Sequence, residues 1–381
     1  MTAAAKLWVT VVLGSLTLLA DTALGAGVRC EAWPAWQRFK LLYLSEDGRV
    51  IDASTPRQIT TSEGQSYALF FALVGNDRAA FDQILRWTQN NLAAGSLEKH
   101  LPAWQWGRAD NDEWRVLDPN AASDADLWIA YTLGEAGRLW KEHWYSQLGA
   151  AVASNIVRQE VATLPELGPT LLPAPIGFAD EHSWRLNPSY LPLSILRGIA
   201  RHTREPIWNQ IALSSERVIM GSAPRGFAAD WVEYTADGFV PDRKTKGVGS
   251  YDAIRVYMWA GMLPASEPSR DRINAVLKPM LNVVAKRPAP VERVDTVTLE
   301  MQGDGSPGFS AAMLPMLASA HMSAALQTHR QRAADESLQG NQGYYSDVLS
   351  LFGLGWLEQR FRFNRAGLLN VRWTPACNRA H

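Results

Sequence analysis

The sequence predicts a single all-α domain that closes as a ring of helical hairpins. Two observations predict it. Apolar residues recur with a helical period from residue 31 to near the C-terminus, and strand signals are confined to short runs such as 294–301. No composition shift or flexible linker divides the 381 residues. A chain with so many consecutive helices favours a closed ring of hairpins over a four-helix bundle.

Eleven helices are expected from this period. The stripe in 78–94 follows the candidate N-caps Asn76 and Asp77, and the stripe in 123–142 follows Ser123. The same test places the other nine at 31–45, 65–75, 144–161, 189–204, 206–221, 250–264, 267–286, 308–328 and 342–360.

Four long connections separate these helices, at 95–120, 162–188, 222–249 and 287–307. They are rich in Trp, Asp and Asn. Loops of this length are uncommon in compact domains unless they are functional. We therefore expect these long loops to be functional.

The first 25 residues have the pattern of a secretory signal peptide. Lys6 is followed by an apolar stretch at 7–20 and by the small residues Ala23, Gly25 and Ala26. The pattern predicts cleavage after Gly25 or Ala26, an exported domain at 26–381, and no stable membrane insertion. The alternative, a retained anchor, is less favoured because a spanning helix needs about 20 apolar residues.

The two cysteines, Cys30 and Cys377, lie at opposite ends of the expected mature chain. In an oxidising compartment they can form one disulfide that joins the termini, or remain as two free thiols. The sequence leaves both alternatives open.

Charge and tryptophan content narrow the class of partner. The chain has 37 Lys+Arg and 38 Asp+Glu, a net charge of −1, which argues against a nucleic-acid partner. It also has 16 Trp, more than a core requires, which suggests aromatic binding surface. Trp33, Trp36 and Trp140 lie on apolar helical stripes and are expected in the core, whereas Trp184 and Trp231 lie in or near the long loops.

Several chemistries are not supported. Residues 303–308 (GDGSPG) have the spacing of a dinucleotide loop, but Pro307 removes an N–H and no βαβ unit surrounds them. The seven histidines show no zinc-binding spacing, and two distant cysteines make no thiolate metal site. No Gly-x-Ser-x-Gly elbow is present. We therefore expect no metal or cofactor, and carboxylate chemistry remains.

Acids stand near the starts of three expected helices. Glu63 precedes an apolar helix and lies close to Phe70 and Phe71, where burial could raise its pKa and keep it protonated. The alternative is that Glu63 only complements the helix dipole. Asp124 and Asp126 begin the next segment; separated by one residue, they point in different directions, and either can be structural.

The third acid, Asp252, has Arg255 three residues later on the same helix face, which favours an ionised carboxylate. A surface ion pair of little energetic value is the alternative. A neutral Glu and an ionised Asp across a cleft are the pair that glycoside hydrolysis requires. Trp104, Trp106 and Trp114 would supply flat surfaces for sugar rings.

Together these segments resemble glycoside hydrolase family 8. Residues 122–126 (ASDAD), Ile129, Ala130, Ala136 and Trp140 follow the family signature, and Thr132 departs where Ala or Ser is usual. The resemblance extends through 62–67 (SEGQSY), 187–192 (NPSYLP), 250–257 (SYDAIRVY) and 308–312 (GFSAA). It runs from Cys30 to near the C-terminus and is greatest to the periplasmic members of bacterial cellulose-synthesis systems.

The resemblance implies that 26–381 is a catalytic domain built as an (α/α)6 barrel, with the long loops forming a substrate cleft at one end. It also implies inverting cleavage of β-1,4-glucan and a periplasmic or secreted location. Glu63 would be the general acid and Asp252 the general base, whereas Asp124 would hold the distorted sugar rather than act as a nucleophile. Tyr190, Tyr251 and Arg255 would line that subsite. Such a barrel has twelve helices, so one is missing from the eleven expected above, and 162–188 or 287–307 is where we expect it.

Three alternatives for function remain. The leading interpretation is an endo-β-1,4-glucanase that acts on glucan during cellulose synthesis and export, where the synthase complex would be a partner. The same fold and acids could act on xylan, mixed-linkage glucan or chitosan. A non-catalytic glucan-binding partner of the export complex is the third. For an inverting hydrolase the carboxyls of Glu63 and Asp252 should lie ~6.5–9.5 Å apart.

Overall fold

The computed structural model describes residues 32–54, 56–335 and 343–373, and these contain twelve α-helices and one 3-10 turn. The helices are α1 (Pro34–Tyr43), α2 (Ser62–Val74), α3 (Arg78–Asn91), α4 (Ser123–Trp140), α5 (His143–Glu160), α6 (Leu193–Thr203), α7 (Ile207–Gly221), α8 (Ala253–Met262), α9 (Arg270–Val284), α10 (Pro307–Ser319), α11 (Ser323–Ala334) and α13 (Gly343–Leu357), with the 3-10 turn η1 (Pro188–Tyr190) before α6.

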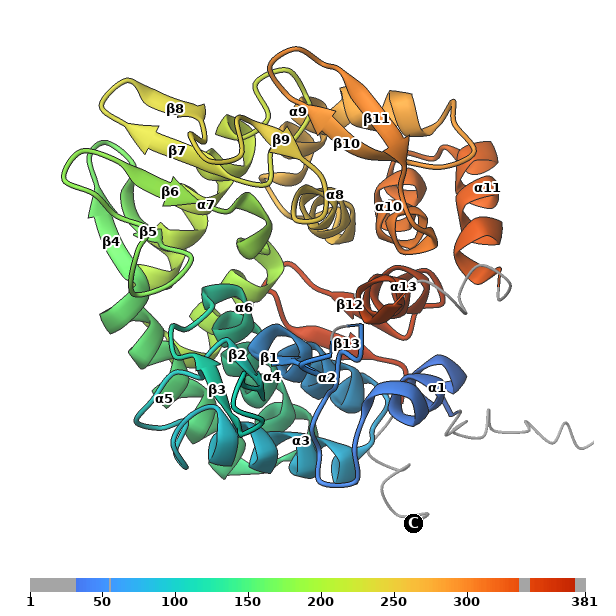
Figure 1. The fold of residues 1–381 in the computed structure, drawn as a ribbon. Helices are drawn as coiled ribbons and strands as arrows, with labels where there is room; N and C mark the ends of the chain where they lie inside the picture. Colours follow the sequence, from blue (N-terminus) through green and yellow to red (C-terminus); the bar gives the residue numbers. More distant parts are fainter. Residues whose placement is uncertain (1–31, 55, 336–342, 374–381) are drawn as a thin grey trace, which may run out of the picture.

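The helices form two concentric rings (Figure 1). Helices α2, α4, α6, α8, α10 and α13 surround the centre, and α1, α3, α5, α7, α9 and α11 lie outside them. Inner helices such as α2 and α10 are apolar and buried on almost every side, whereas the outer α3 buries one face only. A helix that is apolar all round must be covered on all sides, which the second ring achieves. The predicted (α/α)6 barrel is confirmed.

The long connections are antiparallel β-hairpins rather than irregular loops. Thirteen short strands form five small sheets within the described residues. The strands are β1 (Thr60–Thr61), β2 (Gln105–Arg108), β3 (Trp114–Asp118), β4 (Val161–Leu164), β5 (Gly168–Leu171), β6 (Trp184–Leu186), β7 (Val232–Thr235), β8 (Gly238–Pro241), β9 (Val248–Gly249), β10 (Val291–Asp295), β11 (Met301–Asp304), β12 (Phe361–Phe363) and β13 (Leu369–Val371).

Two sequence predictions about the elements are wrong. The expected helix at 308–328 is two helices, because the chain turns between α10 and α11, where His321 takes a left-handed conformation with φ of 56°. The helix expected in 162–188 or 287–307 does not exist, since these segments hold β4–β6 and β10–β11. Strands of three to five residues are too short for a distinct period.

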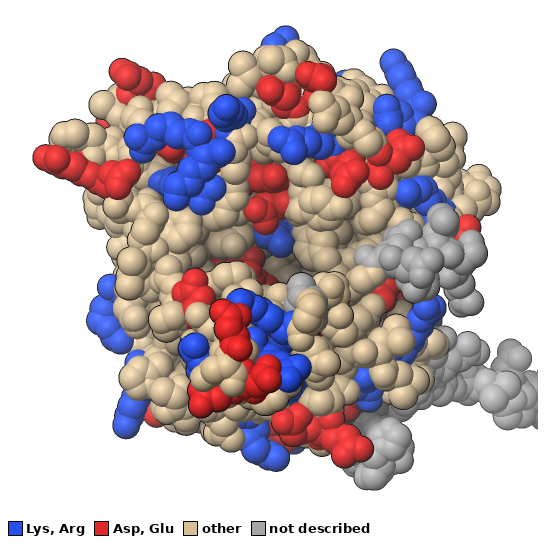
Figure 2. Space-filling view, viewed as in Figure 1, with Lys and Arg blue, Asp and Glu red and all other residues tan. Residues whose placement is uncertain are grey.

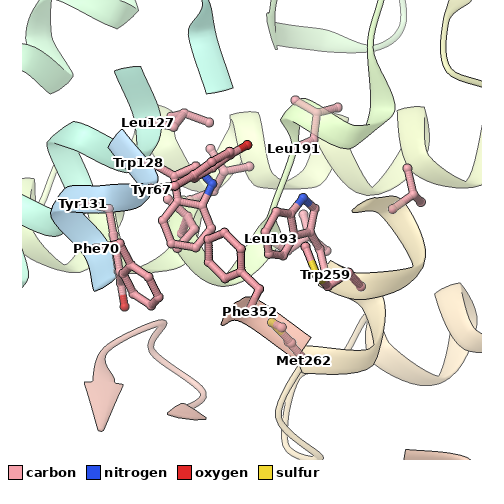
Figure 3. Packing of buried hydrophobic residues seen from close by; sticks show 14 of the residues in the cluster. Tyr67, Phe70, Leu127, Trp128, Tyr131, Leu191, Leu193, Trp259, Met262 and Phe352 are labelled. Atoms are coloured by element: carbon pink, nitrogen blue, oxygen red, sulfur yellow. The ribbon is translucent and has the colours of Figure 1, made fainter. Parts of the chain in front are cut away.

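Aromatic side chains from the inner helices fill the barrel (Figure 3). The Phe352 side chain of α13 is buried, and its ring centroid lies between 4.6 and 5.6 Å from those of Tyr67, Phe70, Phe71, Trp128 and Trp259. These neighbours come from α2, α4 and α8, so Phe352 joins four inner helices. Trp33, Trp36 and Trp140 are also buried, as predicted.

The expected signal peptide at 1–25 and both cysteines, Cys30 and Cys377, lie outside the described residues. Among the helices of the described part, none has the length and apolarity needed to cross a membrane.

Phe352→Ala should lower the free energy of unfolding by about 3–5 kcal/mol, because it opens a cavity at the meeting point of four helices. Urea unfolding followed by circular dichroism measures the change. Leu41→Ala is the control, since Leu41 is 87% exposed. Equal stability of the two variants would contradict the central position of Phe352.

Candidate active site

The three predicted acids lie at the N-terminal ends of three inner helices. Glu63 is in the first turn of α2, where the Thr61 side chain caps the helix by accepting the N–H of Gly64 at 3.1 Å. Asp124 is in the first turn of α4, and Asp252 is the N-cap residue of α8. The positive end of a helix dipole favours a carboxylate at each position.

The Arg255 side chain contacts the acids at two of these helix ends. Its Nη2 lies 2.9 Å from the Asp252 carboxylate and 3.7 Å from that of Asp124, and it donates to the Ser189 hydroxyl at 2.9 Å. The Arg255 side chain is only 9% exposed, so its charge must be balanced within the protein. The predicted pair of Asp252 and Arg255 is therefore an interior ion pair rather than a surface one.

Glu63 and Asp124 are electrostatically linked. Burial raises the pKa of Glu63, and the negative charge of Asp252 adds to this effect against the opposing influence of Arg255. Burial, and then the nearby Glu63 carboxyl, raise the pKa of Asp124 as well. Two carboxyls that disfavour each other's charge retain a proton at neutral pH.

The donors around these two acids indicate where that proton resides. Asp124 accepts the N–H of Ala125 at 2.9 Å and the Tyr67 hydroxyl at 3.4 Å, and Arg255 is nearby. Such contacts favour an ionised Asp124. Glu63 has no cation at ion-pair distance among the described residues, so it is the better site for the proton.

The predicted tyrosines lie next to this cluster. The Tyr190 ring, at the end of η1, has its centroid 5.8 Å from the Arg255 guanidinium carbon. Tyr251 precedes Asp252, is 51% exposed and donates its hydroxyl to Glu292 at 2.9 Å. Both positions agree with a role beside Asp252, and contact with a sugar stays a prediction.

The two predicted tryptophans have different surroundings. Trp104 is half-buried and lies next to the start of α2, because its carbonyl accepts the N–H of Ser62 at 2.9 Å. The Trp106 ring is stacked with Trp114, with centroids 5.4 Å apart, and the Arg49 guanidinium carbon lies 4.4 Å from its centroid. These contacts occupy part of the Trp106 ring, whereas Trp114 is 46% exposed. Sugar stacking on Trp104 and Trp106 stays a prediction.

Sequence reasoning did not single out three side chains of this cluster. Tyr67 donates to Asp124, Ser189 accepts from Arg255, and the Tyr345 hydroxyl lies 3.5 Å from Arg255 and donates to the carbonyl of Tyr251 at 2.6 Å. A signal existed for Tyr67, which is one helical turn after Glu63. Tyr345 is 90 residues from Arg255, so no local pattern connects them.

The face that carries these helix ends is hollowed at its centre, and acidic and basic side chains are visible inside the hollow (Figure 2). A cavity of about 820 Å³ opens beside the Asp252 loop and is lined in part by Asp230, Ser250, Tyr251 and Glu292. Among residues 32–54, 56–335 and 343–373, no group of three or more His, Cys, Asp or Glu side chains is placed to hold a metal ion.

A second pair of acids is buried outside the group formed by Glu63, Asp124 and Asp252. Asp126 of α4 and Glu160 of α5 are fully buried and close enough for each to shift the pKa of the other, and their carboxyl oxygens have no hydrogen-bond donor elsewhere in the described part of the chain. Burial raises the pKa of both carboxyls, and in Glu160 the Asp126 charge adds to the effect. We therefore expect the pair to keep a proton at neutral pH. Of the two acids in 122–126, Asp126 is the one buried against Glu160, whereas Asp124 lies beside Arg255.

A helical barrel with a proton-holding acid and a second carboxylate at the same end of its inner helices defines a glycoside hydrolase that works by acid–base catalysis. The profile of Glycosyl hydrolases family 8 matches residues 8–359. The chain belongs to this family.

Individual relatives agree with this assignment. The chain is 49% identical to an endoglucanase of Escherichia coli O157:H7 over 369 residues, which cover 97% of this chain and 98% of the relative. It is 48% identical to an endoglucanase of Xanthomonas axonopodis pv. citri, over 96% of each chain. The crystal structure of an endo-1,4-D-glucanase from Vibrio fischeri ES114 superposes with a TM-score of 0.82 at 42% identity, covering 89% of this chain and 99% of that one.

The Asp126–Glu160 pair should make stability fall as pH rises. Both acids have a raised pKa, so above about pH 4 the unfolded chain releases protons that the folded chain keeps. Each retained proton contributes a slope of about 1.4 kcal/mol per pH unit. The isosteric double variant Asp126→Asn/Glu160→Gln should therefore lose less stability than the wild type between about pH 6 and pH 9.

Urea unfolding at several pH values measures these slopes. Glu181→Gln is the matched control, because the Glu181 side chain is 89% exposed and its loss should leave the slope unchanged. Identical slopes for the double variant and the wild type would show that the buried pair does not hold a proton.

Proposed function

We propose that this chain is an exported endo-β-1,4-glucanase that cleaves internal bonds of cellulose with inversion. The observation that carries the proposal is the convergence of Glu63, Asp124 and Asp252 around Arg255 at one end of the barrel. The endoglucanase relatives support the choice of β-1,4-glucan. A hollow that opens on the surface suits binding in the middle of a long chain (Figure 2).

Glu63 acts as the general acid. Burial raises its pKa, so its carboxyl carries a proton when the substrate binds. As the bond between the anomeric carbon and the leaving oxygen breaks, the proton passes to that oxygen. The leaving chain departs with a neutral hydroxyl, and Glu63 becomes a carboxylate.

Asp252 acts as the general base. Its carboxylate takes a proton from a water molecule while the water oxygen forms a bond to the anomeric carbon on the face opposite the leaving group. The product sugar therefore has the inverted configuration, and Asp252 is left protonated. Transfer of protons through solvent restores both acids for the next turnover.

Asp124 and Arg255 stabilise the charges that develop between these two groups. Positive charge grows on the sugar ring in the transition state, and an ionised Asp124 lies beside the acid to stabilise it. Arg255 holds the Asp252 and Asp124 carboxylates at distances of 2.9 and 3.7 Å. Asp124 forms no covalent bond to the sugar in this mechanism, because inversion needs none.

The cellular role is part of the same proposal. The predicted signal peptide at 1–25 supports a periplasmic or secreted location, and the resemblance to members of cellulose-synthesis systems supports action on glucan during its synthesis and export. The synthase complex is the proposed partner. A net charge of −1 suits a neutral glucan, which offers no charge to attract.

Glu63→Gln should lower kcat on soluble cellulose by about 10²–10⁴-fold with the fold intact, because the amide cannot donate a proton to the leaving oxygen. On β-cellobiosyl fluoride the loss should be much smaller, since fluoride leaves without protonation. Glu113→Gln, at an exposed position, is the control. Equal losses on the two substrates would rule out Glu63 as the acid.

The anomer formed first from soluble cellulose should be α, and proton NMR during the first minutes of hydrolysis detects it. A β product would contradict inversion.

Reducing-end assays on cellulose, xylan, mixed-linkage glucan and chitosan should show the highest kcat/KM on cellulose. Binding of cellulose without any hydrolysis would instead support the non-catalytic alternative.

A further inference from the structure

The carboxylate of Asp230 holds the backbone that carries Asp252. One oxygen, Oδ1, accepts the N–H of Ser250 at 2.7 Å, of Asp252 at 3.1 Å and of Ala253 at 2.7 Å. Asp230 lies between α7 and β7, 20 to 23 residues before the three residues that it contacts. Three donors on one oxygen are an unusually complete set of bonds for a side chain outside the loop itself.

These bonds hold the backbone of Asp252, whose own carboxylate does not cap the helix. Asp is among the residues most favoured at an N-cap, where its own carboxylate accepts N–H groups of the first turn. Asp252 is the N-cap residue of α8, yet its side chain makes no capping bond and contacts Arg255 instead. Asp230 accepts the N–H groups of Asp252 and Ala253, whereas those of Ile254 and Arg255 bond to the carbonyls of Ser250 and Asp252.

We propose that Asp230 is the positioning residue for the general base: its carboxylate holds the backbone of residues 250–253 and so fixes the direction in which the Asp252 carboxylate faces the cleft. The inference rests on the proposed function, because it takes Asp252 as the base. Asp230 itself touches neither the sugar nor the water in this assignment.

The segment around Asp230 is itself held in place. Its N–H donates to the carbonyl of Val248 at 2.8 Å, and the Tyr257 hydroxyl of α8 accepts the N–H of Ala228 at 2.7 Å. Gly249 allows the loop to approach closely, because a Cβ there would lie 2.1 Å from the carbonyl oxygen of Ala228. The segment that carries Asp230 is therefore held against both β9 and α8.

Other contacts hold the same loop from the opposite side. Tyr345 donates to the carbonyl of Tyr251 at 2.6 Å, and Glu292 accepts the hydroxyls of Tyr251 and Ser250 through its side chain and its carbonyl. None of these bonds involves the N–H groups of Ser250, Asp252 and Ala253. Asp230 supplies the acceptor that none of them provides.

The pKa of Asp230 and the charged groups near it agree with a carboxylate that holds the backbone next to the active site. Burial, and then the Asp252 charge, raise the pKa of Asp230 to about 6, in spite of its three N–H donors. Tyr257 and Tyr345 face it from α8 and α13, and a set of charged side chains lines the cavity that it shares: Lys244, Lys246, Glu292, Arg293 and Asp295.

The test compares Asp230→Ala, Asp230→Asn and Asp252→Asn in the full-length enzyme. Asp230→Ala should lower kcat by about 100-fold, the effect of displacing a catalytic group by about 1 Å, and change KM little. The same loss should appear on β-cellobiosyl fluoride, which needs the base but not the acid. Asp230→Asn should keep kcat within about 10-fold of the wild type, because its amide oxygen can accept the same N–H groups.

The matched control is Asp237→Ala, an exposed acid in the β7–β8 turn, which should retain full activity. Gly249→Ala tests the loop position without altering Asp230, and it should lower kcat on both substrates. It also keeps the proposal testable if thermal unfolding shows that Asp230→Ala is not folded. Unchanged kcat in Gly249→Ala would count against the proposal.

Two outcomes would overturn the positioning role. One is Asp230→Ala with kcat close to that of the wild type while Asp252→Asn is inactive. The other is Asp230→Asn as inactive as Asp252→Asn, which would make the Asp230 charge itself essential. If Asp252→Asn instead remains active on the fluoride, the assignment of the base is wrong and the proposed mechanism fails, whatever the Asp230 variants do.

Discussion

The buried guanidinium of Arg255 is the constraint on which the rest of the cleft depends. A cation removed from water is stable only where carboxylates and hydrogen-bond acceptors surround it. The acceptors of Arg255 come from three other parts of the chain: Asp124 on α4, Ser189 on η1 and Tyr345 on α13. Neutralising the Arg255 charge therefore brings four elements together, and the acids proposed as catalytic lie where these elements meet.

The barrel separates stability from chemistry along the inner helices. Their middle and C-terminal parts carry the aromatic core around Phe352, which needs no polar partner (Figure 3). Their N-terminal ends carry Glu63, Asp124 and Asp252, where helix dipoles favour negative charge. The hairpins between the helices surround these ends, so that substrate contacts can differ without disturbing the core.

Local sequence patterns were sufficient to predict much of the site. Glu63, Asp124 and Asp252 stand near helix starts, and Arg255 follows Asp252 at a spacing that any helix brings together. The short hairpins and the turn at His321 were missed because a few residues produce no recognisable period. Asp230 and Glu160 were missed for a different reason: the groups they contact are far away in the chain, and neither has a local motif.

The sequence by itself determined the helical ring, the family, and the acids proposed for the chemistry, because these follow from periodicity and from short contiguous motifs. Only the tertiary structure decided which of two neighbouring acids joins the group around Arg255. Asp124 faces Arg255, whereas Asp126 is buried against Glu160. It also showed that Asp252 does not cap its own helix. Both outcomes depend on which distant groups surround a carboxylate, and burial and neighbouring charge are properties of the folded chain alone.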